Sequence, residues 1–141
     1  MMETFVSRSE EDTIEIGKRI AAGLTPSVTV LLYGQLGSGK TVLVRGIAQG
    51  LGVDESAAVR SPSFTLINIY PTRSALSLYH VDLYRLEGLR DFYSIGIEEI
   101  LSSDAVVLIE WADRLPIPLQ DAVTIRFTVA DDETRSISVS R

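Results

Sequence analysis

The spacing of apolar residues changes along this chain and separates predicted helices from predicted strands. Near the N-terminus the apolar positions recur every three or four residues, as on the buried face of an amphipathic helix. These positions are Ile16, Ile20, Ala21 and Leu24. Ser9 followed by an acid at Asp12 is typical of a capped helix start, and Gly23 lies near the expected end. Just before this helix, we expect residues 3–7 to form a short strand.

A nearly continuous apolar run at residues 28–33 predicts a strand that is buried on both faces. The glycine-rich segment GQLGSGKT follows directly, at residues 34–41. A second helical pattern then runs to about Leu51, where Gly52 would end the helix. We therefore expect a strand that leads through a glycine-rich loop into a helix.

Alternating patterns dominate the second half of the chain and predict two hairpins. The first joins SFTLINIY to LSLYHVDLYRL through the turn PTRSA, and the second joins AVTIRFTV to TRSISVSR through ADDE. A helix is expected over part of DFYSIGIEEIL, and DAVVLIE predicts another short apolar strand. The whole pattern predicts an α/β fold in which residues 1–141 form a single domain, with a mixed sheet flanked by helices.

Composition narrows the range of functions. A chain of 141 residues with 45% hydrophobic and 23% charged residues has a globular composition. No apolar stretch reaches the ~18 residues of a membrane span, and no secretory signal is visible, so we expect a cytoplasmic protein. The absence of cysteine and the single histidine disfavour zinc and point to a hard cation on oxygen ligands. The net charge of −6 argues against a large footprint on nucleic acid.

The glycine-rich segment satisfies the pattern G-x-x-x-x-G-K-[ST] with Gly34, Gly39, Lys40 and Thr41. In a phosphate-binding loop, main-chain N–H groups point at phosphate oxygens while glycines take positive φ angles, a demand that Gly37 and Gly39 meet. The start of the following helix adds a field that favours anions. Lys40 would reach the β and γ phosphates, and the Thr41 hydroxyl would bind Mg²⁺. The alternative is a glycine-rich turn that only caps a helix.

Two acids stand where they could serve such a loop. Glu110 ends the strand AVVLIE and could bind Mg²⁺ or orient an attacking water, or it could be a solvated strand-end acid. Asp82 shares one face of its expected strand with Leu78 and His80. His80 could orient Asp82 or sense a phosphate, or it could be an ordinary packed or surface residue.

Several further residues leave two interpretations each. Ser61, Ser63 and Thr65 could follow the γ-phosphate as a switch loop does, or belong to a polar edge strand. Arg85 could contact phosphate or form a surface salt bridge. Trp111 could pack inside the protein or present an exposed contact surface.

Read in order, the chain carries the motifs GQLGSGKT, RSPSFTL, YHVDLYRL, GIEEIL and VVLIEWADRL. This series resembles the bacterial TsaE family, the ATP-binding component of tRNA threonylcarbamoyladenosine biosynthesis, from about Ser9 to Arg135. The loop alone would not single out this family, whereas HVDLYRL and LIEW at these distances are specific. The resemblance implies a P-loop mixed sheet with helices on both sides.

The resemblance also implies that the protein binds ATP with Mg²⁺ and hydrolyses it slowly by itself. In the family, turnover supports a complex of TsaD and TsaB that modifies an adenosine beside the tRNA anticodon, so contact with tRNA would be indirect. Thr41 and Glu110 match the metal-binding positions, and Asp82 joins Glu110 and Lys40 as candidates for catalysis. The nucleotide contacts implied by the resemblance are Ser9, Leu36, Gly37, Ser38, Gly39, Lys40, Thr41 and Arg135.

Three other functions would use the same loop. A small-molecule kinase usually adds an arginine-rich lid, and the stretch after Glu110 offers only Arg114. A signalling GTPase needs the sequence N-K-x-D, which is absent. A nucleotide-gated assembly module would bind ATP without essential turnover, and this is the alternative nearest to the preferred function.

Overall fold

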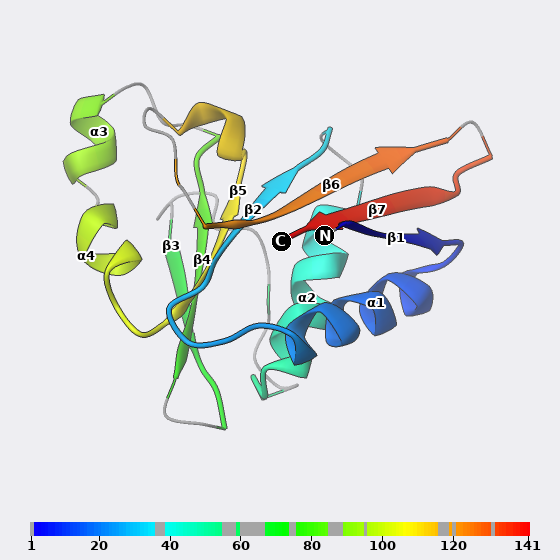
Figure 1. Cartoon of the computed structure of the whole chain (residues 1–141), viewed down its shortest axis with the longest axis horizontal. Helices are drawn as coiled ribbons and strands as arrows, with labels where there is room; N and C mark the ends of the chain where they lie inside the picture. Colours follow the sequence, from blue (N-terminus) through cyan, green and yellow to red (C-terminus); the bar gives the residue numbers. More distant parts are fainter. Residues whose placement is uncertain are drawn as a thin grey trace.

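The computed structural model describes residues 2–35, 39–54, 59, 67–73, 76–84, 89–94, 96–115, 119, 121–130 and 132–141. Within them the elements are β1 (Met2–Ser7), α1 (Glu10–Ala22), β2 (Thr29–Tyr33), α2 (Lys40–Gly50), β3 (Ile67–Pro71), β4 (Ser77–Asp82), α3 (Leu89–Ser94), α4 (Ile97–Leu101), β5 (Val106–Glu110), the 3₁₀ helix η1 (Ala112–Arg114), β6 (Val123–Val129) and β7 (Arg135–Ser140). The strands form one sheet in the order β1-β7-β6-β2-β5-β4-β3 (Figure 1). This architecture confirms the predicted α/β fold.

The central strands of the sheet run parallel. β2 pairs in parallel with β5 on one side and with β6 on the other, and β4 pairs in parallel with β5. The antiparallel pairs β3–β4 and β6–β7 are the two predicted hairpins. Every residue of β5 is buried, as expected of a strand that is covered on both faces.

Helices cover both faces of the sheet, and β2 divides the hydrophobic core between them. Val30 and Leu32 belong to the cluster that contains the buried residues of α1 and α2. Leu31 points the other way and belongs to the cluster that contains Ile97 of α4 and Ala112 of η1. Figure 1 shows α1 and α2 side by side, well separated from α3 and α4. The two-sided burial predicted for the apolar run is confirmed.

Close packing of α1 on α2 depends on glycines, and two of them lie directly against the main chain of the opposite helix. A Cβ atom on Gly46 would lie 2.4 Å from the Ile14 carbonyl oxygen, and one on Gly17 would lie 2.7 Å from the Ile47 nitrogen. Non-bonded atoms do not approach so closely, so a larger residue at either place would push the helices apart. Because α2 begins right after the glycine-rich loop, this packing fixes where the start of the helix points.

The parallel strands bring their carboxyl ends to one edge of the sheet. β2 leads into the glycine-rich loop at this edge, β5 ends there at Glu110, and β4 ends there at Asp82. β1 ends at the same edge, because Ser7 pairs with Arg135 at the start of β7. Segments far apart in the sequence therefore meet beside the loop, where ligands bind in sheets of this type.

Some predicted helices differ in detail from those observed. α1 ends at Ala22, so Leu24 lies beyond the helix, although its side chain still packs against the core. The segment DFYSIGIEEIL forms two short helices, and Gly96, with a φ of 73°, precedes the second. In the part of the chain that the structure describes, no helix has the length and apolar character needed to cross a membrane.

Candidate functional site

The helix α2 begins at the predicted phosphate loop. Gly39 directly precedes it and has a φ of 107°, a left-handed conformation that residues with a Cβ rarely adopt. This confirms the positive φ that the sequence predicts at Gly39. The first turn of α2 contains no acidic residue, so its own side chains do not offset the positive end of the helix dipole. Leu36, Gly37 and Ser38 lie outside the described residues.

Lys40, the first residue of α2, is held against the strand end. Its relative exposure is 5%, and its Nζ donates a hydrogen bond to the Gly34 carbonyl oxygen at 2.7 Å. The same Nζ lies 4.3 Å from the centre of the Trp111 ring, which is an attractive cation–π contact. The ammonium group therefore connects the start of the helix to the ends of β2 and β5.

Trp111 is partly buried, so it packs against neighbouring side chains of the site and also keeps an exposed part. Its ring centre lies 4.9 Å from that of Tyr84, and the Arg114 guanidinium lies 5.5 Å from the centre of the Tyr84 ring. The Trp111 backbone has a φ of 57°, a conformation uncommon for residues other than glycine. Trp111 directly follows the buried strand β5, and with this backbone conformation its indole ring lies against the Lys40 ammonium.

The pairing of β4 with β5 places the two candidate acids side by side, because Asp82 is the strand partner of Glu110. Glu110 is 2% exposed, and its Oε2 lies 2.5 Å from Nε2 of His80. His80 is fully buried. His80 is thus packed inside the protein and contacts Glu110, whereas the sequence left open whether it orients Asp82, senses a phosphate or is an ordinary packed or surface residue.

Asp82 is partly buried and has its own anchor. The backbone N–H of Tyr84 donates a hydrogen bond to Oδ1 of Asp82 at 2.8 Å. Burial of the carboxyl group raises the pKa of Asp82 above its ordinary value of 3.8, and the neighbouring charge of Glu110 acts in the same direction. The Tyr84 N–H and the Lys40 ammonium oppose this shift. A carboxylate with a raised pKa is a better proton acceptor than an ordinary aspartate.

Arg135 and Ser9 reach this edge from the other side of the loop. A Cβ atom on Gly39 would lie 3.1 Å from Nε of Arg135, so the arginine side chain lies against the loop. Ser7 is the strand partner of Arg135, and Ser9 lies two residues further along the chain. The Ser9 hydroxyl accepts a hydrogen bond from the Asp12 N–H at 3.0 Å and caps α1, as predicted.

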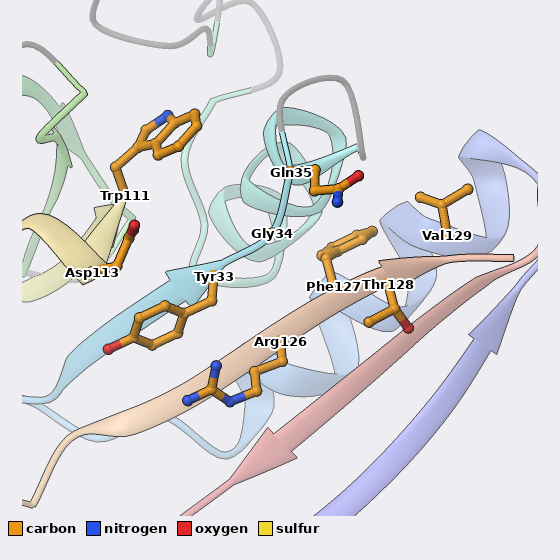
Figure 2. A pocket seen from close by; sticks show the side chains of 9 residues that line it. All are labelled: Tyr33, Gly34, Gln35, Trp111, Asp113, Arg126, Phe127, Thr128 and Val129. Atoms are coloured by element: carbon orange, nitrogen blue, oxygen red, sulfur yellow. The ribbon is translucent and has the colours of Figure 1, made fainter.

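A cavity of about 730 Å³ opens beside the loop (Figure 2). Its lining residues are Tyr33, Gly34, Gln35, Trp111, Asp113, Arg126, Phe127, Thr128 and Val129. Figure 2 shows the Arg126 side chain alongside the Tyr33 ring, and its guanidinium lies 4.5 Å from the ring centre. No local pattern in the sequence indicates this pair, because it depends on the register in which Tyr33 of β2 meets Arg126 of β6.

Side chains that could offer oxygen donors to a metal ion lie on α2 and at the ends of β4 and β5. No group of three or more His, Cys, Asp or Glu side chains among the described residues could hold a metal by itself. A Mg²⁺ ion that arrives with a nucleotide needs only one or two carboxylates besides phosphate and water. Glu110, Asp82 and the Thr41 hydroxyl suit that requirement.

Other predicted contacts cannot be placed at this edge, because they lie outside the described residues. They are Ser61, Ser63, Thr65 and Arg85.

The sheet order and the loop at its carboxyl edge define the chain as an α/β protein with a P-loop-like fold. The crystal structure of Bacillus subtilis YdiB matches it with a TM-score of 0.79 and 31% identity, over 99% of this chain and 84% of that chain. The family model "Threonylcarbamoyl adenosine biosynthesis protein TsaE" matches residues 7–137. The chain belongs to the TsaE family, which is involved in tRNA threonylcarbamoyladenosine biosynthesis, as the resemblance predicted.

Individual relatives show how far the similarity extends. A Treponema pallidum protein named tRNA threonylcarbamoyladenosine biosynthesis protein TsaE is 42% identical over 136 residues, which cover 96% of this chain and 98% of that protein. An Aquifex aeolicus protein of the same name is 35% identical over 141 residues, covering 100% of this chain and 98% of its own. The similarity therefore extends far beyond the loop motif.

Proposed function

We propose that this protein binds ATP with Mg²⁺ at the carboxyl edge of the sheet and hydrolyses it weakly. This turnover would support tRNA threonylcarbamoyladenosine synthesis. One observation carries the proposal: Lys40, Glu110 and Asp82 converge beside the start of α2. A buried cation and two neighbouring acids are the groups that phosphoryl transfer to water requires.

Phosphate binding is supported by the start of α2. The first N–H groups of a helix have no acceptor within the helix, and the helix dipole favours an anion there. The left-handed backbone of Gly39 allows the chain to turn such groups toward a ligand. The Lys40 ammonium, now bound to the Gly34 carbonyl and the Trp111 ring, would exchange these partners for the stronger charge-assisted bonds of phosphate.

Glu110 and Thr41 are the residues that would hold the metal. Bound Mg²⁺ would neutralise charge on the β and γ phosphates. Glu110 stands at the end of its strand with one carboxylate oxygen fixed by His80. The Thr41 hydroxyl, on the first turn of α2, would approach from the phosphate side.

Asp82 is the stronger candidate for accepting a proton from the attacking water. Burial and the charge of Glu110 raise its pKa, and Glu110 beside it would be engaged with the metal. The Tyr84 N–H holds the Asp82 carboxylate in place. The two acids would therefore divide the work between metal binding and proton transfer.

We also propose that turnover acts on a complex of TsaD and TsaB, with only indirect contact to tRNA. Membership of the TsaE family supports partners within this pathway. The net charge of −6 supports indirect contact, because direct binding of RNA draws on clustered lysine and arginine. A small-molecule kinase has less support. It would need an arginine-rich lid, and Arg114, the candidate for such a lid, lies against the Tyr84 ring.

The test measures ATP binding and phosphate release for Lys40→Ala and Glu110→Ala. We expect Lys40→Ala to abolish productive nucleotide binding and Glu110→Ala to reduce Mg²⁺-dependent turnover more than ATP affinity. Lys18→Ala and Glu15→Ala are matched controls, because these two side chains form a 3.1 Å ion pair at the exposed surface of α1. Both controls should behave like the unaltered protein.

The outcomes separate the competing functions. Unchanged turnover in both site variants would remove the site assignment. Phosphate appearing on a small acceptor in place of water would favour a kinase. Tight ATP binding without turnover, even with TsaD, TsaB and tRNA present, would favour a nucleotide-gated assembly module.

A further inference from the structure

His80 is a polar side chain in an apolar part of the sheet. It is fully buried and pairs across the sheet with Leu108 of β5. Its Nε2 contacts Glu110, while its Nδ1 has no hydrogen-bond partner among the described residues. A buried ring nitrogen without a partner lowers the stability of a fold. An aliphatic residue would avoid this loss, so packing alone does not account for a histidine here.

The sheet already holds the backbone of Glu110. Glu110 pairs with Leu32 of β2 and Asp82 of β4, and the Leu83 N–H donates to its carbonyl oxygen at 3.1 Å. What the sheet leaves undetermined is the rotation of the terminal carboxylate, which is a broad torsion. The contact with His80 restrains one carboxylate oxygen and so favours one direction for the other.

Asp82 does not share this anchor. Its Oδ1 accepts a hydrogen bond from the backbone N–H of Tyr84 at 2.8 Å. The two acids are thus oriented by separate groups, although they are strand partners. A change at His80 should alter the orientation of Glu110 while the Asp82 hydrogen bond remains.

We propose that His80 is a positioning residue that orients the Glu110 carboxylate toward the Mg²⁺ of a bound nucleotide. The inference rests on the proposed role of Glu110 in metal binding. Hydrogen bonds from outside the ligand shell orient metal-binding side chains, and losing one weakens metal binding by about 10- to 100-fold. His80 acts through Glu110 and needs no contact with the nucleotide.

The test compares His80→Leu, which fills a similar volume without a donor, with His80→Gln, whose amide can donate to the same carboxylate oxygen. Mn²⁺ binding to the ATP-bound protein is followed by electron paramagnetic resonance, and ATP binding is measured separately in EDTA. We expect His80→Leu to weaken Mn²⁺ binding by at least about tenfold and to leave metal-free ATP binding unchanged. His80→Gln should restore most of the loss.

Thermal unfolding shows whether each variant folds. If His80→Leu does not fold, it is replaced by His80→Asn, whose amide is too short to reach the Glu110 carboxylate. In a Glu110→Ala background, the His80 substitution should cause no further loss of Mn²⁺ binding. Ordinary Mn²⁺ affinity in folded His80→Leu would overturn the inference and leave the proposed function intact. A glutamine no better than leucine, or an equal loss of metal-free ATP binding, would also overturn it. Failure of the unaltered protein to bind ATP would instead remove the proposed function, and this inference with it.

Discussion

The two sides of the glycine-rich loop differ in charge and in burial. On the side of β5 and β4 lie the carboxyl groups of Glu110 and Asp82, and both Glu110 and His80 are almost fully buried. On the side of β6 and β7 lie two arginines, of which Arg126 is exposed and Arg135 is partly buried. Lys40 stands between the two sides, at the start of α2.

This difference indicates a division between reaction and binding. Fixed hydrogen bonds give both acids defined orientations, and burial raises the pKa of Asp82, which suits metal binding and proton transfer. Arginines near the surface are screened by solvent, and their guanidinium groups suit the binding of phosphate. If so, substitutions on the acid side should lower turnover, and substitutions on the arginine side should lower affinity.

The largest effect is expected from Asp82→Asn on the acid side. The amide keeps an oxygen for the Tyr84 N–H but cannot accept a proton from water. Turnover of saturating ATP should fall by about 100-fold while ATP affinity stays the same, as measured by phosphate release and calorimetry. Asp104→Asn, at an exposed position far from the loop in sequence, is the control. A parallel fall in affinity would show that Asp82 binds the nucleotide.

Arg135→Ala tests the other side of the loop. Because the Arg135 side chain lies against Gly39, its loss should weaken ATP binding by about tenfold, or roughly 1.4 kcal/mol, with turnover at saturating ATP unchanged. Arg90→Ala, an exposed arginine on α3, serves as the matched control. Lower turnover at saturation would contradict the division between the two sides.

Local patterns in the sequence predict much of this edge, and long-range register supplies the rest. An apolar run that ends in an acid is enough to place Glu110 at a strand end, and alternation puts His80 and Asp82 on one face. No local pattern shows which acid His80 contacts, because that depends on the pairing of β4 with β5. The contact of Lys40 with Trp111 depends likewise on elements far apart in the sequence.

A smaller effect should be visible in the fluorescence of Trp111, the only tryptophan of the chain. The Lys40 ammonium lies 4.3 Å from the indole, and phosphate would draw it away, so the emission of Trp111 should change when ATP is added. Lys40→Met should emit differently from the unaltered protein without ATP and respond little to its addition. An equal ATP response in both proteins would show that the emission changes without the lysine, and it would contradict the expected loss of ATP binding in a Lys40 variant.

The smallest effect concerns stability and its dependence on pH. Because the pKa of Asp82 is raised in the folded protein, its carboxyl group keeps a proton at pH values just above 3.8, where the same group in the unfolded chain has lost it. The contribution of Asp82 to stability therefore falls as pH rises through that range. The quantity to compare is the melting temperature of Asp82→Asn minus that of the unaltered protein. This difference should be larger at pH 7 than below pH 3.8.

Asp132 provides a comparison of opposite sign in the same melting experiment. The backbone N–H of Thr134 donates to its carboxylate at 3.1 Å and lowers the pKa of Asp132. Its stabilisation is present above pH 3.8 and is lost as pH falls through the lowered value. Compared with the unaltered protein, Asp132→Asn should therefore become less stable as pH rises toward neutral, whereas Asp82→Asn should become more stable. Any pH-independent effect of each substitution cancels between the two pH values. A shift of the same sign in both variants would therefore contradict the raised pKa of Asp82.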